Sequence, residues 1–125
     1  LGLGRMGAPM ARNLVGQVET LVVHDLHPPS VGALAAEGAQ AAGSAAALGE
    51  RCDMVFLSLP TPGIVREAVA EIISGGSPRV ICDLSTSGPK LAQELHDTLA
   101  PRGVASFDAP VSGGIRGAEQ GTLAI

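Results

Sequence analysis

LGLGRMGAPM, Leu1 to Met10, is the stretch that decides the fold. Its three glycines have the GxGxxG spacing, and an apolar pattern at helical intervals follows them: Gly2, Gly4 and Gly7, then Met6, Met10 and Leu14. In such a loop the first glycine permits a tight turn, the second lets the backbone approach a pyrophosphate, and the third allows close packing of helix on strand. The helix N-terminus adds partial positive charge. The stretch therefore predicts a phosphate-binding glycine loop.

A carboxylate follows this loop at the distance expected for a ribose contact. Asp25 ends the apolar run Thr20–Asp25 and lies eighteen residues after Gly7. A carboxylate at such a position accepts both ribose hydroxyls of an adenosine and repels a 2′-phosphate, so it favours NAD over NADP. The alternative interpretation is a glycine-rich turn followed by an unrelated acid.

Apolar runs and helical patterns alternate along the rest of the chain. The runs lack period-two alternation and predict strands buried on both faces: Thr20–Asp25, Cys52–Leu59, Arg79–Leu84 and Val104–Asp108. Helical periodicity appears between them, over residues 30–37, 44–49, 64–73 and 91–99. This order predicts one α/β domain over residues 1–125, a Rossmann-type doubly wound parallel sheet.

The glycine loop also predicts a strand that these residues do not supply. A strand precedes the first glycine of such loops and lies centrally in the sheet, whereas only Leu1 precedes Gly2. We therefore expect a fragment whose truncated sheet lacks its first strand. Such a sheet would expose two inner edges and an open core. The 125-residue polypeptide alone is accordingly expected to be molten or aggregated.

Composition and charge narrow the classes of function. The formal net charge is −4, and the eight basic residues are scattered, so nucleic-acid binding is not expected. No apolar run reaches the length of a membrane span and no targeting leader is recognised, so we expect a cytoplasmic protein. Cys52 and Cys82 are expected to be buried, reduced thiols. His24 and His27 lack a third partner, so no metal site is predicted.

Polar and glycine-rich loops follow the predicted strands at their carboxyl ends, where open α/β sheets bind ligands. Leu59 and Pro60 offer an apolar shelf for a ring. Ser85 and Thr86 offer hydroxyls near the start of a helix, although Thr86 or Ser87 is equally expected to cap that helix. Asp83 and Asp108 end strands and are expected to have structural roles.

A second glycine-rich loop occupies the end of the chain. Ser112, Gly113 and Gly114 combine one hydroxyl with flexible backbone N–H groups, which suits a carboxylate. The alternative is an ordinary glycine turn. Arg116 follows closely, and we hypothesise that it pairs with a second carboxylate of a substrate.

Four stretches resemble the β-hydroxyacid dehydrogenase family, which includes 3-hydroxyisobutyrate dehydrogenase-like enzymes. They are GLGRMGAPMARNL (2–14), SLPTP (58–62), DLSTSGP (83–89) and FDAPVSGGIRGAEQGTLAI (107–125). The last stretch differs from the related 6-phosphogluconate dehydrogenases and imine reductases. The resemblance covers essentially the whole chain and implies the N-terminal NAD-binding domain of an oxidoreductase. Such enzymes interconvert a small β-hydroxy acid and its semialdehyde by hydride transfer.

The resemblance also implies roles for individual residues. The implied cofactor contacts are Gly2, Leu3, Gly4, Arg5, Met6, Gly7, Asp25, Leu59, Pro60 and Thr86. Those implied for the substrate carboxylate are Ser112, Gly113 and Gly114. NAD is the implied cofactor, with NADP less favoured because of Asp25.

No catalytic residue is predicted within the chain. The resemblance implies a catalytic lysine, with an asparagine beside it, beyond Ile125 on a helix that leads into an all-helical second domain. Lys90, the single lysine, adjoins Pro89 and is expected to point into water. The fragment is therefore expected to be inactive, and the parent enzyme to be a homo-oligomer. The alternatives are a non-catalytic nucleotide-binding or interaction module of the same family and a remnant of a decayed gene.

Overall fold

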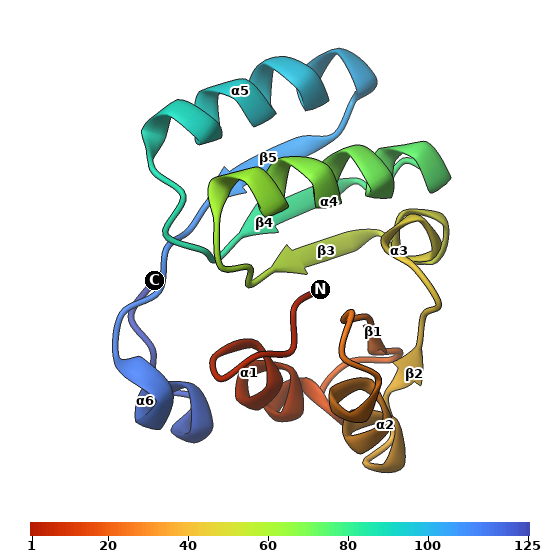
Figure 1. The fold of residues 1–125 in the computed structure, drawn as a ribbon, viewed down its shortest axis with the longest axis vertical. Helices are drawn as coiled ribbons and strands as arrows, with labels where there is room; N and C mark the ends of the chain where they lie inside the picture. The colour runs from red at the N-terminus through yellow and green to blue at the C-terminus, as the bar shows by residue number, and fades with distance from the viewer.

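The computed structural model, which describes residues 1–125, contains two parallel sheets (Figure 1). One sheet pairs β1 (Val22–Val23) with β2 (Gln40–Ala41). The other has the order β3 (Met54–Leu57), β4 (Val80–Asp83) and β5 (Ala105–Asp108). Every strand pair is parallel, which confirms the predicted α/β class with a parallel sheet.

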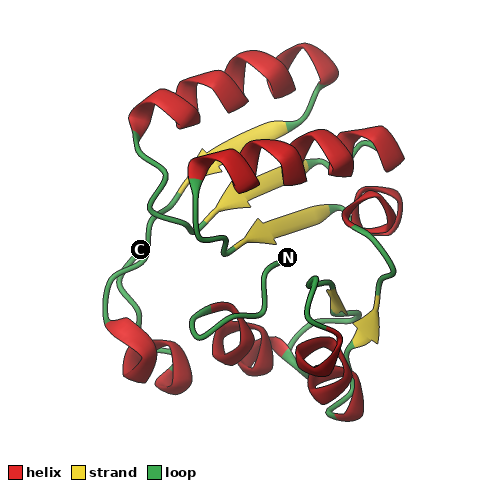
Figure 2. Cartoon of the chain, viewed as in Figure 1, coloured by secondary structure: helices red, strands yellow, loops and turns green.

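Helices connect successive strands, as parallel pairing requires (Figure 2). They are α1 (Gly7–Leu14), α2 (Pro28–Ala36), α3 (Ala45–Arg51), α4 (Pro62–Gly75), α5 (Pro89–Leu99), the 3-10 turn η1 (Ala100–Arg102) and α6 (Gly114–Gln120). Hydroxyl caps begin two of them. Ser44 Oγ accepts from the Ala47 N–H at 3.1 Å, and Thr61 Oγ1 accepts from the Ile64 N–H at 3.3 Å.

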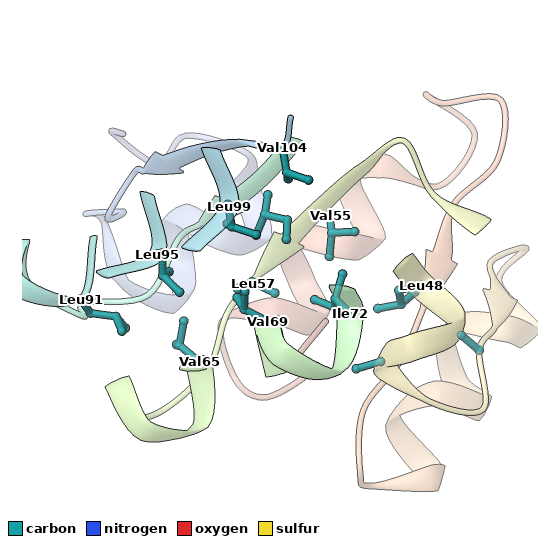
Figure 3. Packing of buried hydrophobic residues seen from close by; sticks show 13 residues of the cluster. Leu48, Val55, Leu57, Val65, Val69, Ile72, Leu91, Leu95, Leu99 and Val104 are labelled. Atoms are coloured by element: carbon teal, nitrogen blue, oxygen red, sulfur yellow. The ribbon is translucent and has the colours of Figure 1, made fainter. Parts of the chain in front are cut away.

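The main hydrophobic core lies between the three-stranded sheet and helices α3, α4 and α5 (Figure 3). It contains 13 buried residues, against four in a second cluster formed by Leu3, Val23, Leu34 and Ala39. The stripe predicted on α5 is confirmed, because its three leucines are buried: Leu91, Leu95 and Leu99. Most of the buried apolar side chains therefore pack against the three-stranded sheet.

The three-stranded sheet is only partly covered on its second face, so the prediction of strands buried on both faces is wrong for β3 and β5, whereas in β4 the neighbouring Ile81 and Cys82 are both buried. Along β3, Val55 and Leu57 are buried, whereas Met54 and Phe56 are 50% and 41% exposed. Phe107 of β5 is 57% exposed, in the same cross-strand row as Phe56. The physical reason is that α3, α4 and α5 all pack on the face that carries Val55, and this leaves the Phe56 face exposed.

An apolar slot separates the two sheets, because the inner edges of β1 and β3 pair with no strand. The cavity there has a volume of about 760 Å³, and 20 of its 29 lining residues are hydrophobic. Leu1 and Gly2 cross its mouth. The Leu1 amino group donates to the Phe56 carbonyl at 2.8 Å, and the Leu1 carbonyl accepts from the Ser58 N–H at 3.0 Å. On the other side the Gly2 N–H donates to the His24 carbonyl at 3.1 Å.

These bonds alternate between the two sheets, as they do for a central strand in a parallel sheet. The open inner edges expected from the sequence are therefore present, and the backbone of Leu1 and Gly2 bridges them. Burial lowers the pKa of the Leu1 amino group from 8.0 to about 6.

Some elements and contacts differ from the sequence-based expectations. The two residues of β2 are exposed and form no apolar run, and α6 lies in a stretch interpreted as a glycine loop, so neither element was predicted. The N-cap of α5 is Gly88, so neither Thr86 nor Ser87 caps that helix. Cys82 is buried, but Cys52 is only partly buried, which corrects that expectation; both thiols are free. No helix combines the length and apolarity needed to cross a membrane.

Candidate functional site

The glycine loop adopts the geometry that its spacing predicts. Gly2 has a φ of +87°, and a side chain there would collide with the Ser58 carbonyl oxygen. A Cβ at Gly7 would overlap the Gly2 carbonyl oxygen, so the start of α1 packs directly on the turn. Gly4 has no atom within 4 Å of its missing Cβ. The first and third glycines are therefore required by packing inside the protein, whereas Gly4 opens onto free space.

Unpaired backbone N–H groups surround that space. The N–H groups of Arg5, Met6 and Gly7 donate to no protein acceptor, and the first paired N–H of α1 is that of Ala8, which donates to the Gly4 carbonyl at 3.0 Å. Met6 caps α1 without a side-chain bond. The positive end of the helix and its free donors therefore meet at the glycine loop, which is an arrangement suited to a phosphate.

Asp25 lies across from these donors and is fixed by two backbone contacts. Its Oδ2 accepts from the Leu3 N–H at 2.5 Å, and its Oδ1 accepts from the His27 N–H at 2.7 Å. A carboxylate has about four acceptor positions, so each oxygen keeps capacity for a ligand hydroxyl. Asp25 therefore holds the glycine loop in place and still presents a negative, hydrogen-bond-accepting edge.

One cavity of about 610 Å³ joins the glycine loop to Asp25. It brings together eight of the ten residues named for the cofactor: Gly2, Gly4, Arg5, Met6, Gly7, Asp25, Leu59 and Pro60. Leu3 is 4% exposed and lines the apolar slot instead. Thr86 is exposed and lies outside the cavity. The cavity therefore brings the unpaired N–H groups of the glycine loop and the Asp25 carboxylate to one continuous surface.

The sheet ends connect this cavity to the loop that carries Thr86. The Leu59 N–H donates to Ser85 Oγ at 2.9 Å, and the Ser85 N–H donates to Asp83 Oδ1 at 2.9 Å. Asp83 is 3% exposed, and its hydrogen bond is structural, in line with the role expected for it. Ser87 Oγ is buried and has no hydrogen-bond partner in the protein. The loop thus carries one hydroxyl, that of Ser87, without a hydrogen-bond partner, close to the Ser85 backbone that these bonds hold in place.

The second glycine loop folds into a closed unit that comprises residues 112–124. Ser112 and Ala124 exchange two backbone hydrogen bonds, at 2.8 and 2.9 Å. Gly113 and Gly114 have φ values of +131° and +62°, in the region that favours glycine. Helix α6 starts at Gly114, directly after the loop. Ser112, Gly113 and Gly114 line neither the apolar slot nor the cavity at Asp25, and all three are exposed.

Two residues of the cavity wall were missed by sequence reasoning. Glu71 Oε1 accepts from the Ala45 N–H at 3.1 Å, at the start of α3. His24 is 8% exposed, and its Nδ1 lies 2.9 Å from the Ala42 carbonyl, so Nδ1 carries the proton in the neutral ring. His24 was considered only as a metal ligand, and no apolar or helical pattern singles out Glu71.

The remaining candidates lie apart from the cavity. Lys90 is exposed, which confirms the water-facing position expected for it, and His96 is exposed as well. His27 Nδ1 lies 2.9 Å from Ser30 Oγ. No three His, Cys, Asp or Glu side chains come together in a group able to hold a metal ion. Burial raises the pKa of both thiols, Cys52 and Cys82, which disfavours the reactive thiolate form.

Comparisons with known proteins agree with this geometry. The family model described as the NAD binding domain of 6-phosphogluconate dehydrogenase matches residues 1–125. The chain is 39% identical over 131 residues to 2-(hydroxymethyl)glutarate dehydrogenase of Eubacterium barkeri, covering 100% of the chain and 43% of that protein. It is 40% identical over 129 residues to the NAD-dependent L-serine dehydrogenase of Pseudomonas aeruginosa, covering 98% of the chain and 43% of that protein.

A solved structure extends the likeness to the fold. The chain superposes on 3-hydroxyisobutyrate dehydrogenase of Mycobacterium tuberculosis, solved with L-serine, with a TM-score of 0.91 and 36% identity. The match covers 98% of this chain and 42% of that one. The Rossmann-type fold predicted from the sequence is thereby confirmed. The chain spans about two fifths of the length of the curated relatives named above.

Proposed function

Because this chain belongs to the family described as the NAD binding domain of 6-phosphogluconate dehydrogenase, and within it to the β-hydroxyacid dehydrogenases, we propose that it binds NAD(H) for hydride exchange with a small β-hydroxy acid. The observation that carries this proposal is the cavity that joins the free N–H groups at the start of α1 to Asp25. The bound nicotinamide would supply the hydride chemistry.

Different residues of the site would contact different parts of the cofactor. The N–H groups of Arg5, Met6 and Gly7 would hold the pyrophosphate, for which the bare Gly4 leaves room. Leu59 and Pro60 would contact the cofactor along its length, and Thr86 would reach the nicotinamide ribose. The fit is supported by donors that the protein itself leaves unpaired, and by the unused hydroxyl of Ser87 beside Thr86.

Asp25 would select NAD over NADP. Its oxygens are fixed by backbone N–H groups, so the carboxylate cannot turn away from a ribose placed beside it. A 2′-phosphate there would meet a fixed negative charge. Leu26, the next residue, is 93% exposed and offers no cation to offset that repulsion. The NAD-dependent relative from P. aeruginosa supports this preference.

Ser112, Gly113 and Gly114 would hold the substrate carboxylate. The substrates in the names of the three relatives above share a hydroxyl on the carbon β to a carboxylate. The loop offers a hydroxyl and the N–H groups of two glycines with positive φ, which together suit one carboxylate. Arg116, which is exposed, would favour a second carboxylate, and Arg116→Ala should then abolish any preference for diacids over monoacids.

The proton of the hydroxyl would be taken by a group outside residues 1–125. Lys90 is exposed at the start of α5, and the pKa of neither thiol is lowered, so the chain offers no base tuned to this task. This chain's own residues would therefore bind and orient the two reactants. The parent enzyme would assemble into a homo-oligomer and would have no nucleic-acid or membrane partner.

Titration of the chain with NADH and NADPH, followed by nicotinamide fluorescence, tests the cofactor site. We expect NADH to bind at least about tenfold more tightly than NADPH, because of the fixed carboxylate. Asp25→Asn should bring the two affinities close together. Asp97→Asn, which removes an exposed carboxylate on α5, is the matched control and should leave the ratio unchanged. Equal affinities in the unmodified chain would refute the NAD preference.

The same titration separates the proposal from its alternative. A chain that binds neither dinucleotide is not a cofactor domain at all. A chain that binds NADH but gives no response of the Ser112–Gly114 amides to a β-hydroxy acid would be a nucleotide-binding module without a substrate site.

A further inference from the structure

The unit formed by residues 112–124 is nearly independent of the rest of the protein. Its backbone–backbone hydrogen bonds are internal: besides the Ser112–Ala124 pair, the Thr122 N–H donates to the Gly117 carbonyl at 2.9 Å. The Leu123 side chain packs on Gly113 and Gly117 inside the unit. On its inner side the unit borders the apolar slot, which is lined by Ala118, Gly121 and Leu123 among others. Neither sheet holds the unit in place by backbone pairing.

One hydrogen bond joins this unit to the remainder of the chain. Asn13 Nδ2, on α1, donates to the Ala118 carbonyl of α6 at 2.7 Å. Ala118 is fully buried, and α6 packs its small residues against α1. A Cβ at Gly121 would come within 3.5 Å of the same amide nitrogen. The amide nitrogen therefore lies close to the unit at both Ala118 and Gly121, although Asn13 itself is largely exposed.

The position of Asn13 gives this bond a consequence for geometry. Helix α1 begins at the glycine loop, where the free N–H groups face the cofactor cavity, and Asn13 lies near the other end of the same helix. Helix α6 begins directly after Ser112 and Gly113. Helices α1 and α6 therefore connect the two loops, and the bond from the Asn13 amide to Ala118 helps to fix how far apart the loops are.

We propose that Asn13 is a positioning residue, which sets the place of the Ser112–Gly114 loop relative to the glycine loop through its bond to the Ala118 carbonyl. The inference rests on the proposed function for its purpose, because it assumes that the two loops hold the two reactants. It adds a residue that contacts neither reactant.

The test uses the full chain with Asn13→Ala and the shape-matched Asn13→Asp, which lacks the donor. Because Asn13 is exposed, its loss leaves no cavity and both variants should fold. We expect amide hydrogen exchange within residues 112–124 to accelerate about five- to tenfold, with exchange in β3 and β4 unchanged. NADH affinity should stay within about twofold, and the affinity of the NADH complex for 3-hydroxypropanoate should fall about five- to tenfold. Asn13→Gln, which keeps the donor, should restore part of the loss.

Arg12→Ala is the matched control. It alters the neighbouring residue of α1 and breaks the exposed Arg12–Glu37 ion pair, which leads to α2 and not to α6. It should change neither exchange in residues 112–124 nor 3-hydroxypropanoate affinity.

Unchanged exchange in Asn13→Ala would overturn the anchoring role. Equal losses of NADH and 3-hydroxypropanoate affinity would also overturn the proposal, since they would show a general loss of structure. A wild-type chain that binds NADH but not 3-hydroxypropanoate would refute the substrate site, and with it the purpose proposed for Asn13, while the exchange data would still report the contact itself.

Discussion

The two sheets of this molecule differ in how many apolar residues they bury and in how close they lie to the candidate cofactor site. The three-stranded sheet has strands of four residues and a core of 13 buried residues, whereas the two-stranded sheet has strands of two residues and a cluster of four. Yet the glycine loop and Asp25 adjoin the smaller sheet. The residues best suited to hold a cofactor therefore belong to the part of the fold with the least buried apolar surface.

The difference follows from what each half can bury. Helices α3, α4 and α5 share one sheet face, so each leucine or valine there contacts neighbours from several elements. In the smaller half the inner edge of β1 faces the apolar slot, and only Leu1 and Gly2 connect it with β3. A ligand bound at the glycine loop would therefore add stability where the chain alone has least.

The largest effects should come from deleting matched leucines in the two cores. Leu57 and Leu34 are both fully buried, the first in the large cluster and the second in the small one. We expect Leu57→Ala to lower the free energy of unfolding by about 4 kcal/mol, and Leu34→Ala by about 2 kcal/mol, because a small cluster collapses more readily around a lost side chain. Urea denaturation measures both losses, and a non-cooperative transition of the unmodified chain would instead bear out the expectation, drawn from the sequence, that the chain alone is molten. Equal losses of unfolding free energy in the two variants would contradict the expected difference between the large and the small core cluster.

Filling the apolar slot with a strand should reduce the difference in stability between the two sheets. A polypeptide with five β-branched apolar residues added before Leu1 should gain about 3 kcal/mol, because the added strand pairs with β1 and β3 and buries its side chains in the slot. The control is an extension of equal length with alternating prolines and aspartates, which cannot pair. Equal midpoints of thermal unfolding for the two extended chains would show that the slot does not accept a strand.

A smaller effect should appear with pH at the junction of the two sheets. Burial lowers the pKa of the Leu1 amino group to about 6 from 8.0, so the unfolded chain binds more protons between these values and stability rises from pH 6 to pH 8. The expected gain is about 1 kcal/mol, since the residue is only partly buried. Acetylation of the amino group keeps an N–H donor and removes the charge. Urea denaturation should show a flatter profile for the acetylated chain, and identical profiles would contradict the assignment.

The smallest effects should come from two exposed ion pairs, one in each half. Arg12–Glu37 joins α1 to the end of α2, and Arg66–Glu94 joins α4 to α5. Each arginine lowers the pKa of its glutamate partner through a hydrogen bond, so the stabilisation is present at neutral pH and is lost as pH falls through the carboxylate pKa. Arg12→Gln and Arg66→Gln should each lower the unfolding midpoint slightly in dilute buffer and not at all in 1 M salt. A loss that persists in salt would indicate lost packing instead.

The sequence predicted individual helices, strands and loops better than it predicted which of their residues would be covered or in contact. Spacing alone indicated the glycine loop, Asp25 and the stripe of α5, because each depends on short-range geometry. The exposed Phe56 and Phe107 were not foreseen, because an apolar residue carries no sign of which sheet face a helix will cover. Asn13 shows a similar limit: its partner is 105 residues away in the chain, and no local pattern relates them.

Asp25 has a consequence for protein engineering. The residue that would set the preference between two coenzymes also fastens the glycine loop through Leu3 and the following turn through His27. Selectivity and loop geometry are therefore not independent design variables. A redesign that replaces the carboxylate must also supply two new acceptors for these N–H groups. Otherwise the variant will accept both coenzymes but bind each of them more weakly.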